Sequence, residues 1–233
     1  MSYAQQIADR LAPLRKASMA VLLVFLVISV FVIPFFTVRS SLVSRLVQDL
    51  LLSLILLAGM ITASERPKAF PPISLLAFVA IIVRWASWLF PADLTQTIRE
   101  ETTLVAVALI SAAVGVNVFG PGKVTADRIN GAVVLYILMG LIWAKAYQLL
   151  SIFVPNAFHG ATLSQDSNNP ATWVYFSFVT LSTAGYGDIL PLVPQARSLT
   201  NLEELIGQLY PAIVLARLVS LHLAGGDSDT NKS

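Results

Sequence analysis

Cysteine is absent from this chain, and charged residues make up only 12% of its 233 positions. The absence of cysteine excludes disulfide bonds and thiolate metal sites. A typical soluble domain has about 25% charged and about 45–50% apolar residues, whereas 56% of this chain is hydrophobic. The net charge of +2 is too small to indicate a nucleic-acid partner. This composition is typical of a protein that crosses a membrane several times.

Groups of residues that would support catalysis are also missing. No carboxylate pair has a useful helical spacing, no Gly-Lys-Ser/Thr phosphate loop occurs, and the two histidines, His159 and His222, lie far apart. We therefore expect that the protein is not an enzyme and that it has no cofactor.

Long apolar runs are what the sequence contains instead. A transmembrane helix needs about 20 predominantly apolar residues. Six runs of about this length are present, at residues 17–37, 46–63, 72–90, 102–119, 130–153 and 198–223. A shorter run, residues 171–182, would reach only about 18 Å as a helix, which is too short to cross a core of about 30 Å. The sequence predicts an all-α membrane protein with six transmembrane helices and one re-entrant half-helix.

The basic residues of the loops predict an orientation. With the N-terminus in the cytoplasm, the inner side carries Arg10, Arg15, Lys16, Arg66, Lys68, Lys123, Arg128 and Lys232, and the outer side carries Arg39, Arg45, Arg99 and Arg197. This excess of positive charge inside is the usual one. We expect a multi-pass protein of the cell membrane with both termini in the cytoplasm, and its short loops and small size favour a prokaryotic inner membrane.

One stretch after the half-helix is not helical in composition. Residues 180–191 read TLSTAGYGDILP, and the glycines at 185 and 187 favour positive φ. Non-helical backbone at membrane depth is stable only where it is buried in protein or lines a watery path. Backbone carbonyls can replace the hydration shell of a cation. The stretch is thus predicted to present carbonyls to a dehydrated ion.

The sequence Thr-Ala-Gly-Tyr-Gly-Asp at residues 183–188 resembles the selectivity-filter signature of the potassium channel family, which usually reads Thr-Val-Gly-Tyr-Gly-Asp. Five of the six positions match. An aromatic-rich half-helix precedes the stretch, and Pro191 and Gly207 follow Asp188 by three and nineteen residues, as in the family. The resemblance covers residues 130–223.

The resemblance implies that potassium ions are bound by the backbone carbonyls of Thr183, Ala184, Gly185 and Tyr186, with the hydroxyl of Thr183. It also implies a homotetramer, because one chain supplies one strip of carbonyls and four chains close the ring. Potassium is then the permeant ion rather than a cofactor, and membrane lipids are the other partners.

The resemblance further implies that Gly187 and Asp188 support the filter. Since Val179 stands where some members of the family have a glutamate, we expect Tyr175 or Trp173 to brace Asp188. Ala184 replaces the usual valine, so its carbonyl is kept and two methyl groups of packing are lost. We expect potassium selectivity with a filter that collapses or passes sodium more readily.

Two alternatives remain. The chain could be a weakly selective monovalent cation channel, or it could be a non-conducting membrane scaffold or a secondary transporter. Transporters are often built from repeats with paired broken helices, and only one interrupted segment is present here.

Gating residues are sparse. Residues 102–119 stand where voltage-gated channels carry repeated arginines, and they contain no basic residue. Each charge that crosses the membrane field provides about 2.3 kcal/mol per 100 mV, so we expect weak or no voltage dependence; Arg84 alone could contribute. Gly207 and Pro211 predict a gate hinge, with a fixed kink as the alternative.

Charged residues also lie within the later apolar runs. Lys145 and Glu203 fall in the same half of the bilayer, about 22 Å and about 9 Å along their helices. We expect Lys145 to pair with Glu203 or Glu204 behind the pore. The alternative is a glutamate that faces the permeation path and attracts cations.

The predicted organisation has three parts. Residues 1–125 form a four-helix membrane domain in the position of a voltage sensor, 126–224 form the pore domain, and 225–233 form a short cytoplasmic tail. The first domain is either a degenerate sensor-like bundle or a lipid-facing scaffold.

Overall fold

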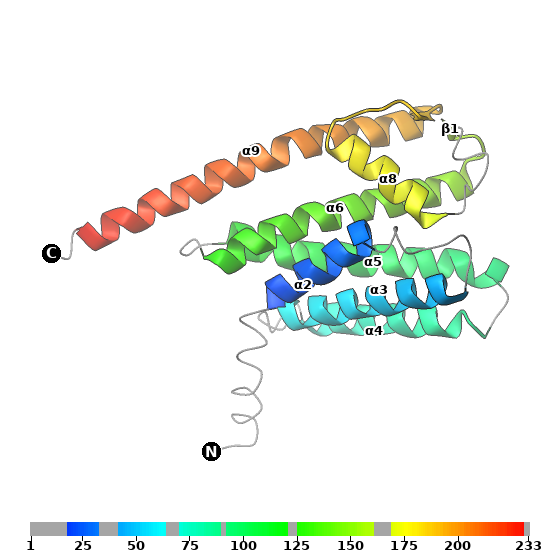
Figure 1. Cartoon of the computed structure of the whole chain (residues 1–233), viewed down its shortest axis with the longest axis horizontal. Coiled ribbons are helices and arrows are strands. Elements are labelled where there is room, and N and C mark those ends of the chain that lie inside the picture. Colours follow the sequence, from blue (N-terminus) through cyan, green and yellow to red (C-terminus); the bar gives the residue numbers. More distant parts are fainter. Residues whose placement is uncertain are drawn as a thin grey trace, which may run out of the picture. The chain divides into compact units, whose positions relative to one another are not determined.

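The computed structural model describes residues 18–32, 42–63, 70–89, 92–120, 125–160 and 169–230. This part of the chain is mostly helical, with one two-stranded sheet (Figure 1). Contacts between residues divide the chain into two compact units. The first contains Met1–Gly120 and Thr125–Leu135, and the second contains Pro121–Val124 and Tyr136–Ser233. The predicted boundary at residue 125 lies ten residues before Leu135. The helix that begins directly after this boundary, at Ala126, belongs partly to each unit.

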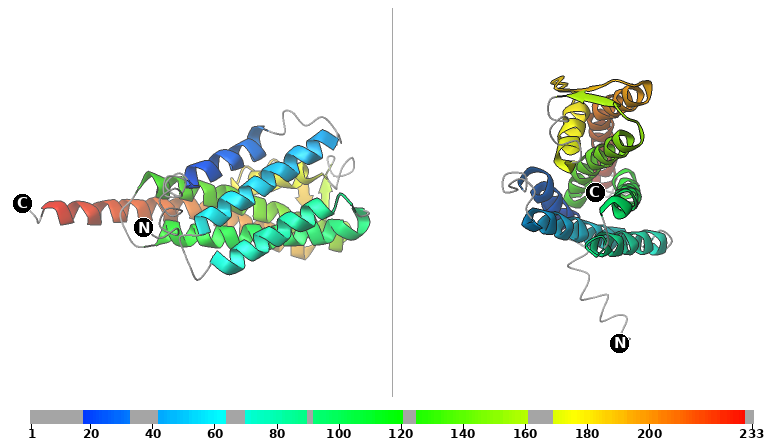
Figure 2. Two further views of the ribbon diagram at one scale, coloured as in Figure 1. Left: turned by 90° about the horizontal axis from the view of Figure 1, so that it is seen from below. Right: turned by 90° about the vertical axis from the view of Figure 1, so that its right-hand side faces the viewer.

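The first unit is a bundle of helices. Its elements are α2 (Ser18–Val27), which continues as the π-helix η1 (Ile28–Val32), α3 (Leu42–Ala63), α4 (Phe70–Ala86), α5 (Ala92–Phe119) and the start of α6. In this unit α3 contacts α2, α4 and α5, and α4 also packs on α5 (Figure 2). Gly59 permits a close approach between α3 and α5, because an added Cβ would lie only 2.6 Å from Ile110. The four apolar runs predicted before residue 120 are therefore helical where the structure describes them, except that residues 87–89, at the end of run 72–90, form a turn.

The second unit contains the rest of α6 (Ala126–Phe153), β1 (Phe158–Gly160), α8 (Pro170–Leu181), β2 (Ile189–Pro191) and α9 (Pro194–Thr230). The strands are antiparallel, with Phe158 opposite Pro191 and Gly160 opposite Ile189. The Leu192 amide extends the pairing by donating to the Ala157 carbonyl at 2.9 Å. This sheet joins the segment after α6 to the segment that follows the glycine-containing stretch.

Helix α8 begins where the sequence predicts. The side chain of Asn169 caps it by accepting from the Ala171 amide at 3.0 Å, and Pro170 occupies the first helical turn. Both residues are favoured at these positions, because the cap satisfies an orphan amide and proline has none to satisfy. Asn168, which directly precedes the cap in the sequence, lies outside the described residues. The short apolar run is confirmed as a helix of 12 residues, and its re-entrant placement in the membrane stays a prediction.

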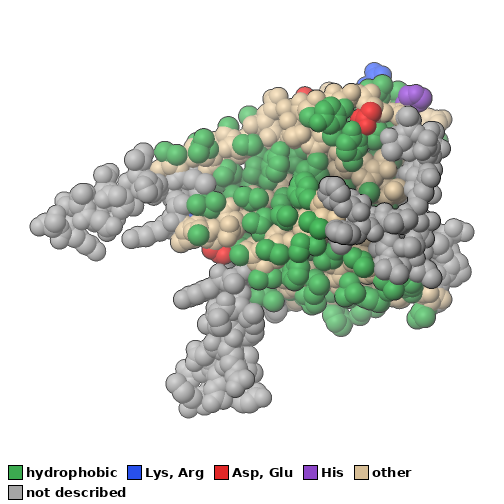
Figure 3. Space-filling model, in the orientation of Figure 1, with side chains coloured by type: hydrophobic (Ala, Val, Ile, Leu, Met, Phe, Trp, Pro, Cys, Tyr) green, Lys and Arg blue, Asp and Glu red, His purple; other side chains and the backbone are tan. Residues whose placement is uncertain are grey.

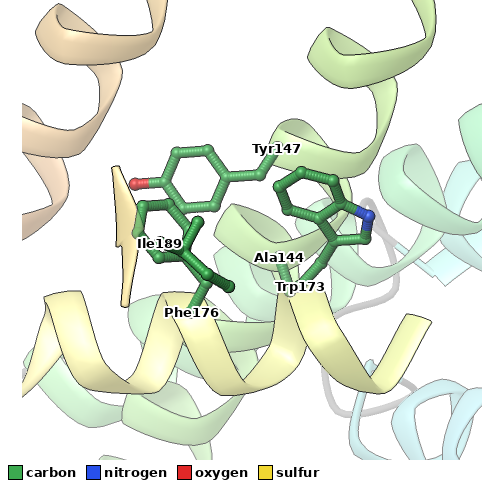
Figure 4. Packing of buried hydrophobic residues seen from close by; sticks show 5 residues of the cluster. All are labelled: Ala144, Tyr147, Trp173, Phe176 and Ile189. Carbon is green, nitrogen blue, oxygen red and sulfur yellow. The ribbon is translucent and has the colours of Figure 1, made fainter. Parts of the chain in front are cut away.

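An aromatic cluster holds α8 against α6 and β2. It consists of Ala144, Tyr147, Trp173, Phe176 and Ile189, which are all buried (Figure 4). The rings of Tyr147 and Phe176 lie 4.9 Å apart between centroids, and Phe158 of β1 stacks edge-on against Trp173 at 5.0 Å. Such aromatic pairs add about 0.5–1.5 kcal/mol each to the burial of their surface. The position of α8 is thus fixed by large, stiff side chains.

Two helices in the described part of the chain are long and apolar enough to cross a membrane, within Glu101–Phe119 and Ala126–Phe153. Three further apolar helices are shorter, at Met19–Val32, Leu46–Ile61 and Pro71–Ala86. Hydrophobic side chains also cover much of the described surface in Figure 3, and charged ones are few there. These features favour a membrane protein, and the six crossings stay a prediction.

Candidate functional site

Within residues 180–191, α8 ends at Leu181 and β2 begins at Ile189. Residues 182–188 between them form the glycine-containing stretch, and its backbone alternates in handedness. Thr183, Gly185 and Gly187 have positive φ, at 58°, 53° and 75°, whereas Ala184 and Tyr186 do not. This alternation is the conformation that the two glycines predict. Thr183 is β-branched, so its positive φ is rare. A rare backbone conformation persists only where its surroundings enforce it.

The end of α8 provides that enforcement. The Thr183 amide donates to the Thr180 carbonyl at 2.8 Å, and the Ala184 amide donates to the Val179 carbonyl at 2.9 Å. The Gly185 amide also reaches the Val179 carbonyl, at 3.4 Å. These bonds use the amide groups at the start of the stretch and leave its carbonyls for another partner.

Those carbonyls have no hydrogen-bond donor in the described part of the chain: none donates to the carbonyl of Thr183, Ala184, Gly185 or Tyr186. The stretch is also uncovered. Tyr186 is 72% exposed, and a Cβ added at Gly185 or Gly187 would have no neighbour within 4 Å. Backbone carbonyls normally find a partner. A cation or a further chain can therefore approach this strip directly.

Asp188 ends the stretch and has a partner on α8. The Tyr175 and Asp188 side chains share a hydrogen bond, which is one of the two bracing contacts that the sequence predicts. The other candidate, Trp173, is 1% exposed and packs in the aromatic cluster. Of the two, Tyr175 therefore makes the described contact with Asp188, and the supporting role of both residues stays a prediction.

Gly207 lies against the end of α8. A Cβ added at Gly207 would stand 1.9 Å from the carbonyl oxygen of Leu181, which is an impossible contact. The Tyr136 hydroxyl donates to the same oxygen at 3.3 Å. Helix α9 is continuous through Gly207 and Pro211. The glycine thus has a packing reason that sequence reasoning missed, and the hinge stays a prediction.

Glu203 corrects another expectation. It is fully buried, and its carboxyl oxygens contact the hydroxyls of Tyr147 and Ser177, each at 2.5 Å. The described contacts of Lys145 include a bond to Gln148 Oε1 at 3.0 Å on its own helix. Lys145 is therefore not among the described partners of Glu203, contrary to the prediction. The reason is that α9 turns the Glu203 side chain toward hydroxyls on α8 and α6. The same burial keeps Glu203 from facing a permeation path, whereas Glu204 is exposed.

Arg84, in the first unit, has a partner that the sequence analysis did not name. Its guanidinium donates to Asp49 Oδ1 at 2.6 Å, and to the Thr103 hydroxyl at 3.3 Å. The Trp88 indole donates to the other oxygen of Asp49 at 3.0 Å. A signal was available: Asp49 is the only charged residue of run 46–63 and Arg84 is the only one of run 72–90. Opposite charges in apolar runs usually pair.

Residues 131–222 match the family model described as an ion channel. The matched segment contains most of α6, all of α8, the glycine-containing stretch and most of α9. No similar protein was found among the curated proteins or the solved structures. The match supports an ion channel family and passive ion conduction, and it argues against an enzyme.

Proposed function

We propose that this protein is a potassium channel in which four copies of the chain surround one pore. The observation that carries the proposal is the strip at residues 183–186, which has alternating backbone handedness and carbonyls without a donor in the described chain. The ion-channel match over residues 131–222 supports it. Carbonyl rings of this kind replace the water of a potassium ion. The ion sites are assigned to Thr183, Ala184, Gly185 and Tyr186.

The homotetramer follows from the exposure of the strip. A single chain offers carbonyls from one side only, and identical subunits close a ring by cyclic symmetry. Helix α9 also presents large apolar side chains, namely Leu202, Leu205, Leu209, Ile213, Leu215 and Val219, which are between 48% and 65% exposed. A surface of this kind marks contact with protein or membrane. Neighbouring copies and lipid tails are its proposed partners.

The direction of α8 gives a second preference for cations. Its C-terminal residue, Leu181, comes two residues before the strip. The C-terminus of a helix carries about half a negative charge. A cation on the inner side of the strip would be stabilised by the ends of four such helices.

Selectivity and gating form the finer part of the proposal. Ala184 provides its carbonyl without the packing of valine, so a weakly selective cation channel is the second candidate. Voltage dependence should be weak, because residues 102–119 of α5 contain no basic residue and Arg84 is paired with Asp49. The proposed location is the cell membrane, with both termini in the cytoplasm.

The experiment is a potassium flux assay with the purified protein in liposomes. We expect barium-sensitive potassium uptake that exceeds sodium uptake. Equal uptake of both ions would favour the second candidate, and no uptake by a folded tetramer would favour a scaffold. The Ala184→Val variant should raise the ratio of potassium to sodium uptake.

A pair of glycine variants makes the assay specific for the strip. Gly185→Ala places a Cβ in open space but at φ 53°, where alanine is strained, so conduction should be lost while the fold is kept. Gly115→Ala, in α5, meets only Leu135 at 3.5 Å and should conduct normally. Equal conduction by both variants would overturn the assignment of the strip.

A further inference from the structure

The hydroxyl of Ser177 lies between two oxygens that belong to different helices. Its Oγ is 2.7 Å from the Gly140 carbonyl oxygen of α6 and 2.5 Å from Glu203 Oε1 of α9. Ser177 itself belongs to α8 and is fully buried. The second oxygen of Glu203 accepts from the Tyr147 hydroxyl at 2.5 Å. These contacts connect α6, α8 and α9 within the second unit.

The number of hydrogens decides the protonation of Glu203. A serine hydroxyl donates one hydrogen, and a backbone carbonyl and an ionised carboxylate can only accept. If Glu203 were ionised, Ser177 would face two acceptors with one hydrogen, and one of its two short contacts would lack a hydrogen. Tyr147 cannot relieve this conflict, because its single hydrogen is donated to the other carboxyl oxygen, Glu203 Oε2.

A proton on Glu203 Oε1 removes the conflict. Glu203 then donates to Ser177, Ser177 donates to the Gly140 carbonyl, and Tyr147 donates to Glu203 Oε2. Each of the three contacts then has one hydrogen, and all three hydrogen bonds are donated in the same direction, from Tyr147 to Glu203, to Ser177 and to Gly140. The same proton avoids the high free-energy cost of a charged carboxylate at a buried position in a membrane.

The groups that face Glu203 do not supply a compensating charge. From α6, Tyr147 bonds to it and Tyr136 lies within its electrostatic reach. From α8, the facing group is Ser177, and on α9 itself the Thr200 hydroxyl donates to the Ala196 carbonyl at 2.8 Å. Among the described contacts of Glu203, none is made by lysine, arginine or histidine.

We propose that Glu203 is a neutral carboxylic acid whose proton completes the chain from Glu203 through Ser177 to Gly140, and that this chain positions α8 and therefore the strip. The positioning role rests on the proposed function, because it concerns the selectivity of ion conduction. Loss of the proton would turn the Ser177 hydrogen toward the carboxylate and release the Gly140 carbonyl. Glu203 is thus a positioning residue, since it acts on the strip through α8.

Infrared spectroscopy tests the protonation without any assay of conduction. The native protein in detergent or lipid should show the carbonyl band of a protonated carboxyl group at neutral pH, and this band should be missing from Glu203→Gln. If the difference spectrum of the native protein and Glu203→Gln at neutral pH lacks this band, the proposal is overturned. If the band is present and the protein does not conduct, the proposed function fails and the protonation stands.

Conduction tests the positioning role. Glutamine can donate at one position and accept at the other, as the neutral acid does, so Glu203→Gln should keep potassium selectivity at neutral pH. The native protein should lose selectivity as alkaline pH removes the proton, and Glu203→Gln should not. Ser177→Ala should have low selectivity at every pH, whereas Ser111→Ala, which removes a buried hydroxyl bonded to its own helix, should behave as the native protein. Identical pH profiles for the native protein and Glu203→Gln would refute the role.

Discussion

Gly207 of α9 and the carbonyl oxygen of Leu181 lie in direct contact, with no room between them for a methyl group. Leu181 is the last residue of α8, and residues 183 and 184 bond back to the same helical turn. The end of α8 that precedes the strip is therefore supported by backbone atoms of α9. Any side chain at position 207 would displace either α9 or the end of α8.

Gly207→Ala should destabilise the second unit and reduce potassium selectivity. Overpacking usually costs about 1–3 kcal/mol, and here the opposing atom belongs to the backbone and cannot change rotamer. Thermal unfolding and the ratio of potassium to sodium flux measure the two effects, with Gly115→Ala as the control. If Gly207 acts only as a hinge, the variant would change the open probability and leave both measurements unchanged.

The pair formed by Arg84 and Asp49 should stabilise the first unit only as a pair. Removing one partner of a buried ion pair typically costs about 3–5 kcal/mol, whereas replacing both by apolar residues is often neutral. Arg84→Met and Asp49→Leu should each lower the unfolding temperature, and the double variant should recover most of the loss. Additive losses in the double variant would show that the two side chains do not depend on each other.

Tyr175→Phe should weaken the outer end of the strip. It removes the hydroxyl that bonds to Asp188 and keeps the ring. We expect potassium conduction that declines during a sustained recording, because Asp188 loses a fixed partner. Phe153→Leu, at an exposed position near the end of α6, is the control. Stable currents from Tyr175→Phe would mean that this bond does not support the strip.

The relation between conductance and voltage should be shallow. Residues 102–119 carry no basic residue, and the charge of Arg84 is held by Asp49 at 2.6 Å. Each charge moved through the field contributes about 2.3 kcal/mol per 100 mV, so neither residues 102–119 nor Arg84 is expected to provide a steep response. Planar-bilayer recordings measure the slope, and a slope that requires several gating charges would contradict this expectation.

Much of this fold could be predicted because its signals are local. Apolar runs predict the helices, Asn169 and Pro170 predict the start of α8, and two alternate glycines predict the alternating backbone after it. The partner of Glu203 could not be predicted in this way. Charge alone favours Lys145, whereas the helical rotation of α9 turns the carboxyl group toward Ser177 and Tyr147. Side-chain direction depends on packing between helices, which a single sequence does not display.

The missed role of Gly207 has the same cause. In the sequence, a glycine four residues before Pro211 indicates flexibility. In the structure, the same absence of a side chain permits contact with the Leu181 oxygen. The sequence alone does not distinguish a glycine that makes a helix flexible from one that permits a close contact, because the position of the opposing helix decides which role it has.

The strip is anchored at both ends, and this fixes its length. Its first residues bond to the last turn of α8, and Ile189, directly after Asp188, begins the strand that pairs with β1. Ile189 is 3% exposed, and a shift of one residue turns a strand side chain to the opposite face. Substitutions between the anchors change the chemistry of the strip, but one inserted residue would expose Ile189 or break the bonds to α8. Sequence variation in this protein is therefore expected to change which residues form the strip and to preserve the number of residues in it.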